Sequence, residues 1–311
     1  MAAPSVVKRP AKRRRPPKPT TGRRSTLLVV VFALGLVALV LAYLLGLGSG
    51  DTSASSGLPR TSDYHSLLVA PDDARKLQLG THEGLFRSVD GGMTWTHASL
   101  AGSDAMNLAQ PSASTVWAAG HDVLSRSVDG GTTWEDVRPT GLPGLDVHGF
   151  AVDPRDPTRL LAAIAGQGLF GSTDGGKSFA LVSRQVGPGV MALAIFPNGR
   201  VLAGDMSTNA LVGSSDGGKT WMPLIEASVM GLAVNPADPR RVLASGPGVL
   251  LSSDGGARWR QTLQVPAGSG PIAWSTSNPR TAYVVGLDRS LYRSTDGGAT
   301  WSQVVAEEAS R

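Results

Sequence analysis

Histidine and methionine, two residue types that bind transition metals, recur at matching places along the chain. The sequence has five histidines, seven methionines and no cysteine, so a thiolate site is excluded. Imidazole and thioether form a soft ligand set that suits copper, and Cu(I) in particular. The sequence therefore supports a copper-site hypothesis if the fold brings these side chains together. The candidate ligands are His65, His82, His121, His148, Met191 and Met230.

An octet of the form Ser-x-Asp-Gly-Gly-x-(Thr/Ser/Arg)-(Trp/Phe) is the element that must position them. Six copies begin at residues 88, 127, 172, 214, 252 and 294. Asp-Gly-Gly supplies the positive-φ positions of a tight hairpin turn, and the carboxylate can accept hydrogen bonds from nearby N–H and hydroxyl groups. Each copy offers one carboxylate, whereas calcium takes six to eight oxygens, so the octets are interpreted as turns. These structural aspartates are Asp90, Asp129, Asp174, Asp216, Asp254 and Asp296.

Short apolar runs between the octets predict β-strands. The third unit contains VHGFAV, RLLAAI, GLFGS and FALVS, separated by turns rich in Gly, Pro and Asp. Four strands in each unit of about 41 residues are typical of a propeller blade. The sequence therefore predicts an all-β fold, a six-bladed β-propeller over residues 63–308.

The octet resembles the Asp box, or BNR repeat, of sialidases, photosystem II assembly factors, sortilin-type receptors and xyloglucanases. The segment THEGLFRSVDGGMTW is also similar to an uncharacterised bacterial family of exported BNR proteins, labelled glycosyl hydrolase by analogy. The resemblance covers the whole predicted propeller and implies its fold. Enzymes and non-enzymes share the box, so function must be argued from a site.

The resemblance implies that the box joins the third and fourth strands of each blade. The opposite face then carries the start of every innermost strand and the turn after every second strand. The strand starts hold His65, Met106, His148, Met191, Met230 and Gly270. The turns hold His82, His121, Gln167, Asp205, Gly246 and Asp288. The copper hypothesis competes with a plainer interpretation, in which methionine fills the channel and histidine caps strand ends.

Residues 27–47 form an apolar stretch without a charge, and they predict a transmembrane helix. A helix of this length spans about 31 Å, the thickness of a hydrocarbon core, whereas the apolar region of a signal peptide is shorter. Basic residues precede the stretch, which by the positive-inside rule predicts a cytoplasmic N-terminus. The predicted organisation is a basic cytoplasmic tail (1–25), a transmembrane helix (26–48), a linker (49–62) and an extracytoplasmic propeller at the cell membrane.

The formal charge of +5 combines two unlike parts. Residues 1–50 hold nine Lys or Arg and no acidic residue, and the remaining 20 basic and 24 acidic residues give the rest of the chain a charge of −4. A basic groove for nucleic acid is therefore not predicted.

The sequence favours a binding or assembly module for a protein or glycan ligand, with the copper site as an additional hypothesis. The alternative is a sialidase-like glycoside hydrolase. Resemblance to sialidases implies three arginines around the substrate carboxylate, and only Arg138, Arg184 and Arg289 fall near the face opposite the boxes. A two-carboxylate hydrolase would use Asp205 and Asp288, although such aspartates are typical turn formers.

Overall fold

The computed structural model describes residues 55–186 and 189–305. They belong to the second of two compact units, Thr52–Arg311. The predicted tail and transmembrane helix, residues 1–25 and 26–48, lie outside the described residues. Within those described ranges, no helix is both long and apolar enough to cross a membrane.

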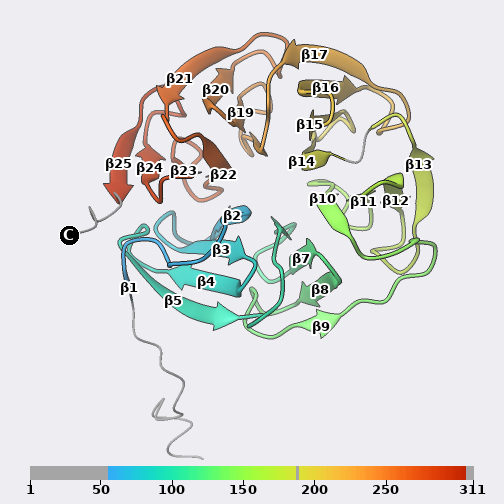
Figure 1. The fold of residues 1–311 in the computed structure, drawn as a ribbon, viewed down its shortest axis with the longest axis horizontal. Helices are drawn as coiled ribbons and strands as arrows, with labels where there is room; N and C mark the ends of the chain where they lie inside the picture. Colours follow the sequence, from blue (N-terminus) through green and yellow to red (C-terminus); the bar gives the residue numbers. More distant parts are fainter. Residues whose placement is uncertain (1–54, 187–188, 306–311) are drawn as a thin grey trace, which may run out of the picture. The chain divides into compact units, whose positions relative to one another are not determined.

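The described chain forms six antiparallel sheets arranged in a ring (Figure 1). Blade 1 contains β1 (Ser55–Ser56), β2 (Ser66–Val69), β3 (Leu77–Thr81), β4 (Gly84–Ser88) and β5 (Thr94–Ser99). Blade 2 contains β6 (Asn107–Ala109), β7 (Val116–Gly120), β8 (Val123–Ser127) and β9 (Glu135–Asp136). Blade 3 contains β10 (Val147–Val152), β11 (Leu160–Ile164), β12 (Gly168–Ser172) and β13 (Ala180–Ser183).

The second half of the ring repeats the same order. Blade 4 contains β14 (Val190–Ile195), β15 (Val201–Asp205), β16 (Ala210–Ser214) and β17 (Met222–Glu226). Blade 5 contains β18 (Gly231–Val234), β19 (Val242–Ser245), β20 (Gly248–Ser252) and β21 (Arg260–Gln264). Blade 6 contains β22 (Ser269–Trp274), β23 (Ala282–Gly286), β24 (Leu291–Ser294) and β25 (Ser302–Val305). The predicted six-bladed, all-β propeller is confirmed.

When blade 1 is counted from β2, the first strand of each blade lies nearest the centre of the ring and the fourth lies toward the rim (Figure 1). Every octet joins the third strand to the fourth, so all six octets lie on one face, the box face. The opposite face, here the site face, carries the turns between second and third strands and the connections between blades. Blade 1 has an additional outer strand, β1, which pairs with β5. This strand lies within the segment that the sequence predicted as a linker.

The first octet shows how a box satisfies its own polar groups. Ser88 Oγ donates to Asp90 Oδ1 at 2.8 Å and accepts the Gly92 N–H at 2.8 Å. The Asp90 carboxylate accepts the Thr94 N–H at 3.0 Å and the Thr94 hydroxyl at 2.6 Å. Trp95 Nε1 donates to the Gly92 carbonyl at 3.0 Å. The other five boxes repeat the Ser–Asp bond at 2.7 or 2.8 Å, so each of these aspartates accepts hydrogen bonds within its own turn.

Apolar side chains between neighbouring blades form the core. Where the ring closes, Leu67 and Leu79 of blade 1 pack in one cluster with Tyr283 and Leu291 of blade 6. Each sheet is built from one continuous segment of the described chain. Blade 6 is therefore joined to blade 1 by side-chain packing and not by a shared strand.

Candidate functional site

The six residues predicted at the starts of the innermost strands meet around one constriction of the channel. They are His65, Met106, His148, Met191, Met230 and Gly270, and Tyr64 and Pro271 complete the lining. The cavity has a volume of about 20 Å³, room for about one water molecule. Two histidines and three methionines thus line a narrow cavity at the site-face end of the channel, here the channel mouth.

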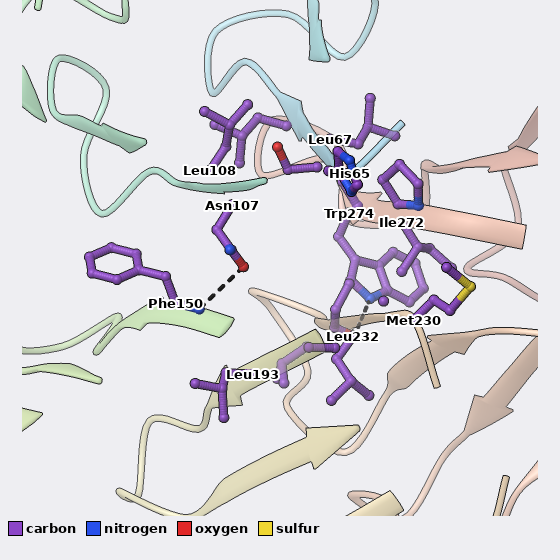
Figure 2. Close-up of a pocket in the computed structure, with 18 of the residues that line it drawn as sticks. His65, Leu67, Asn107, Leu108, Phe150, Leu193, Met230, Leu232, Ile272 and Trp274 are labelled. Atoms are coloured by element: carbon purple, nitrogen blue, oxygen red, sulfur yellow. Dashed lines mark hydrogen bonds between the residues drawn. The ribbon is translucent and has the colours of Figure 1, made fainter. Parts of the chain in front are cut away.

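Beyond the mouth lies a cavity of about 250 Å³, and most of the residues that line it have apolar side chains. Figure 2 shows side chains from several blades around it, among them Leu67, Leu108, Phe150, Leu193, Leu232, Ile272 and Trp274. Asn107 Oδ1 accepts the Phe150 N–H at 3.2 Å, and Asn107 Nδ2 donates to the His148 carbonyl at 3.2 Å. Met191 and Met230 line both cavities, and so pack where the plainer interpretation of the methionines expects them.

Four histidines and three aspartates follow one another across blades 1 to 3 on the site face. We call these seven residues the histidine–aspartate arc: Asp63, His65, His82, Asp104, His121, Asp146 and His148. Each histidine of the arc approaches at least one carboxylate or a second histidine within hydrogen-bonding distance. The arc therefore concentrates titratable and metal-ligating groups on one part of the molecule.

Backbone contacts between blades hold the arc in place. The Ala105 N–H donates to the Thr81 carbonyl at 3.0 Å, beside the β3–β4 turn that carries His82. His121, in the β7–β8 turn, pairs with Asp146 in an isolated antiparallel bridge. The last residue of β7 is a glycine because the neighbouring chain runs too close for a side chain. A Cβ added at Gly120 would lie 2.1 Å from the Asp104 carbonyl oxygen.

Asp104 lies at the middle of the arc, with its side chain only 11% exposed. Its Oδ2 is 2.5 Å from His121 Nδ1 in a hydrogen bond. Its Oδ1 lies 3.0 Å from His82 Nδ1, but makes no hydrogen bond of good geometry to any described residue. The rings of His82 and His121 are nearly parallel, with centroids 6.2 Å apart. One largely buried carboxylate thus faces the Nδ1 atoms of two histidines.

The Nε2 atoms of the same two histidines point toward the ends of the arc. At one end, His82 Nε2 lies 2.9 Å from His65 Nε2 and 3.5 Å from Asp63 Oδ2. At the other end, His121 Nε2 lies 3.3 Å from His148 Nε2 and 3.3 Å from Asp146 Oδ1. Each end therefore brings two imidazoles and one carboxylate together.

Burial lowers the pKa of His65 below its ordinary value of 6.5, and the neighbouring His82 lowers it further. Asp104 and Asp63 oppose this shift without reversing it. His65 is consequently neutral at pH 7 and carries a lone pair on one ring nitrogen.

The structure thus brings together the four histidines singled out from the sequence and places both predicted methionines at the channel mouth. Sequence reasoning missed the carboxylates of the arc. A signal for them was present, since an aspartate lies two residues before the strand-start residue of each of the first three blades, in Asp63-Tyr-His65, Asp104-Ala-Met106 and Asp146-Val-His148.

The two carboxylates considered for a hydrolase form turns on other blades. Asp205 is buried, and its Oδ1 accepts the Ser207 N–H at 3.0 Å and the Ser207 hydroxyl at 2.6 Å. Asp288 accepts the N–H and hydroxyl of Ser290 in the same way. Both side chains stabilise their own loops, as turn-forming aspartates do.

Residues 66–310 match the family described as photosynthesis system II assembly factor YCF48. No curated protein matches the chain. Two structures of YCF48 are similar to it. The first, YCF48 bound to D1 peptide, has a TM-score of 0.53 and 19% identity over 82% of this chain and 85% of that one. The second, YCF48 from Cyanidioschyzon merolae, has a TM-score of 0.53 and 17% identity over 80% and 87%.

A glycoside hydrolase family 74 (GH74) xyloglucanase from Xanthomonas campestris shares the fold as well. Its TM-score is 0.56 with 21% identity over 83% of this chain. The match covers 47% of the xyloglucanase, so the chain spans about half the length of that enzyme. At these identities the structural likenesses show the propeller fold alone.

Proposed function

Since the chain belongs to the family of the photosystem II assembly factor YCF48, we propose that it is a protein-binding or assembly module. Its partner docks on the site face, over the histidine–aspartate arc and the channel mouth. The proposal concerns the class of ligand, a polypeptide segment, and not the identity of the partner.

The observation that carries this proposal is the contrast between the two faces. The box face repeats one turn six times, and each turn satisfies its own hydrogen bonds. The site face instead varies from blade to blade, with histidine in two turns and glutamine, glycine or aspartate in others. A repeated scaffold with one non-repeating face suits recognition, because binding residues lie on loops that a rigid scaffold positions.

The charge of the site face favours a basic segment as the partner. On blades 1 to 3 this face has more acidic than basic side chains: five carboxylates (Asp63, Glu83, Asp104, Asp122 and Asp146) against two arginines (Arg138 and Arg184). Charge complementarity raises the association rate and excludes partners of like charge. The similar structure of YCF48 holds a D1 peptide, which supports a polypeptide as the ligand class.

We further propose that the propeller is held at the outer side of the cell membrane by one span over residues 26–48. The support is the uncharged stretch at 27–47 and the nine basic residues before it. A partner on the site face would then be a membrane protein or another protein near that surface.

Site-specific photo-crosslinking tests which face binds the partner. A photoreactive amino acid replaces Glu83 or Gln167 on the site face, or Val89 or Val128 on the box face, all exposed positions. We expect adducts with one protein from the two site-face positions, and none from the matched box-face pair. The identified partner's segment should then bind the purified chain, and Glu83→Lys should weaken that binding.

Equal adducts from both faces, or adducts from the box face alone, would contradict the proposal. Release of sugar from a labelled glycan panel by the purified chain would instead support the hydrolase alternative.

A further inference from the structure

We propose that His121, His148 and Asp146 bind one divalent transition-metal ion of the zinc class, with Asp104 as the carboxylate that orients His121. This site lies at one end of the arc and contains no methionine. It shares His121 and His148 with the copper site that the sequence suggested, but Asp146 takes the place of the methionines and the class of metal is different. It does not depend on the proposed partner.

The spacing of the three ligand atoms is the first argument. His121 Nε2 and His148 Nε2 are 3.3 Å apart, and Asp146 Oδ1 lies 3.3 Å from the first and 3.1 Å from the second. Zinc binds nitrogen and oxygen ligands at about 2.0–2.2 Å in a tetrahedron, which places any two ligand atoms about 3.3 Å apart. The three atoms thus form one face of such a tetrahedron.

The protonation of His121 is the second argument. A carboxylate only accepts hydrogen bonds, so the 2.5 Å bond to Asp104 Oδ2 places a proton on His121 Nδ1. In the neutral ring, Nε2 then carries a lone pair that faces both the Asp146 carboxylate and the second imidazole. This lone pair is satisfied by a ring N–H of His148, by an additional ring proton on His121 or by a bound metal ion, and the last of these also fits the tetrahedral spacing.

The position of Asp104 favours the metal ion. Ligating histidines commonly donate their other ring N–H to a carboxylate, which fixes the tautomer and raises ligand basicity. Asp104 is the most buried carboxylate of the arc and holds His121 in this way. The ligands themselves are 23–53% exposed, so an ion can reach them from solvent.

The donor set decides the class of metal. Two imidazoles and one carboxylate suit Zn²⁺ and similar borderline divalent ions, whereas Cu(I) favours sulfur ligands. Three protein ligands leave a fourth position, which is open to water or to a side chain of a partner.

Titration of Zn²⁺ into the metal-free full chain tests the site. Calorimetry should show one equivalent per chain, and Co²⁺ should give the visible absorption of a tetrahedral site. His121→Ala and His148→Ala should each abolish that uptake. The matched controls, His65→Ala at the other end of the arc and His97→Ala on β5, should retain it.

Asp104→Asn tests the positioning role. We expect a 10- to 100-fold weaker Zn²⁺ affinity with unchanged stoichiometry, as is usual for a carboxylate behind a ligating histidine. The ring ¹⁵N shifts of His121 should report a mixed tautomer in this variant and the Nδ1–H form in the parent chain. Unchanged thermal unfolding of every metal-free variant shows that the fold is retained.

Three outcomes would overturn the proposal. The first is absence of Zn²⁺ uptake by the parent chain, which would indicate a ring proton in place of the metal. The second is uptake unchanged in His121→Ala and His148→Ala. The third is loss of uptake in His65→Ala alone, which would assign the ion to the other end of the arc. None of these results depends on whether a polypeptide binds the site face.

Discussion

The seventh residue of the octet determines how many hydrogen bonds each box carboxylate accepts. In the first box, the Thr94 hydroxyl donates to Asp90 Oδ2 at 2.6 Å. The fifth box has Arg258 at this position, and Asp254 keeps only the bonds from backbone N–H groups and from Ser252. The six turns thus form an internal series in which one hydroxyl is varied.

The Thr94 hydroxyl should contribute measurably to stability. We expect Thr94→Val to lower the free energy of unfolding by about 1 kcal/mol, because one partly buried hydrogen bond to a charged acceptor is lost. Thr94→Ser keeps the hydroxyl and is the matched control. Urea unfolding of the three proteins compares them, and a loss in Thr94→Ser with none in Thr94→Val would assign the effect to the methyl group instead.

Hydrogen bonds to the boxes also predict acid sensitivity. Bonds from Thr220 lower the pKa of Asp216 below the ordinary 3.8, and those from Thr133 do the same for Asp129. The folded chain therefore binds fewer protons than the unfolded chain at low pH, so this stabilisation is complete above pH 3.8 and is lost as pH falls below it. Urea midpoints should decrease from pH 4 toward pH 2, and a flat profile there would contradict the assignment.

At the scale of elements, the six boxes made the fold predictable, because the same turn recurs with the same hydrogen bonds at each third-to-fourth strand connection. The two sets of site-face residues, at the starts of the innermost strands and in the turns after the second strands, followed from that register. The carboxylates of the arc were missed, because Asp104 and Asp146 lie in connections between blades and Asp63 lies in the segment before β2, all outside the repeated octet. Their proximity to histidines on neighbouring turns depends on how adjacent blades pack, and strand patterns within a blade do not encode it.

The close approach of the Gly120 backbone to the Asp104 carbonyl should hold the side chains of the arc in position. We expect Gly120→Ala to destabilise the chain by about 1–3 kcal/mol, as overpacking does, since its Cβ would meet the Asp104 carbonyl oxygen. It should also shift the NMR signals of His121 and His82. Gly144→Ala is the control, because an added Cβ there has no atom within 4 Å. Equal effects of the two substitutions would contradict this explanation.

At the scale of the whole molecule, two features lead to predictions: the contact that closes the ring of blades and the segment that precedes blade 1. The closing contact is apolar, with Leu291 of blade 6 fully buried in the cluster that it shares with blade 1. The segment before the ring contains the predicted membrane span, which lies outside the described residues.

Ring closure should depend on Leu291. We expect Leu291→Ala to cost about 2–5 kcal/mol and to speed hydrogen exchange in both β2 and β22, because one cavity opens between the two blades. Leu181→Ala, at an exposed position on β13, should change stability by less than about 0.5 kcal/mol. Faster exchange confined to blade 6 would argue against coupling across the closure.

The absence of cysteine makes the predicted topology easy to test. A single cysteine at exposed Ser112 should react with a membrane-impermeant maleimide in intact cells, whereas one at Ser5 should react only after lysis. Protection of Ser112→Cys in intact cells would contradict an extracytoplasmic propeller.

The continuity of each blade in sequence has a consequence for the order of events during synthesis. In the described chain, every sheet consists of strands that are consecutive in the sequence. Each blade can therefore form as soon as its own fourth strand has been synthesised. The closing cluster, in contrast, joins residues separated by roughly 220 positions, a long-range contact that is slow to form. We therefore expect the apolar flank of blade 1 to stay uncovered until the last blade is complete. During that interval a nascent chain would be most prone to aggregate and most dependent on chaperones.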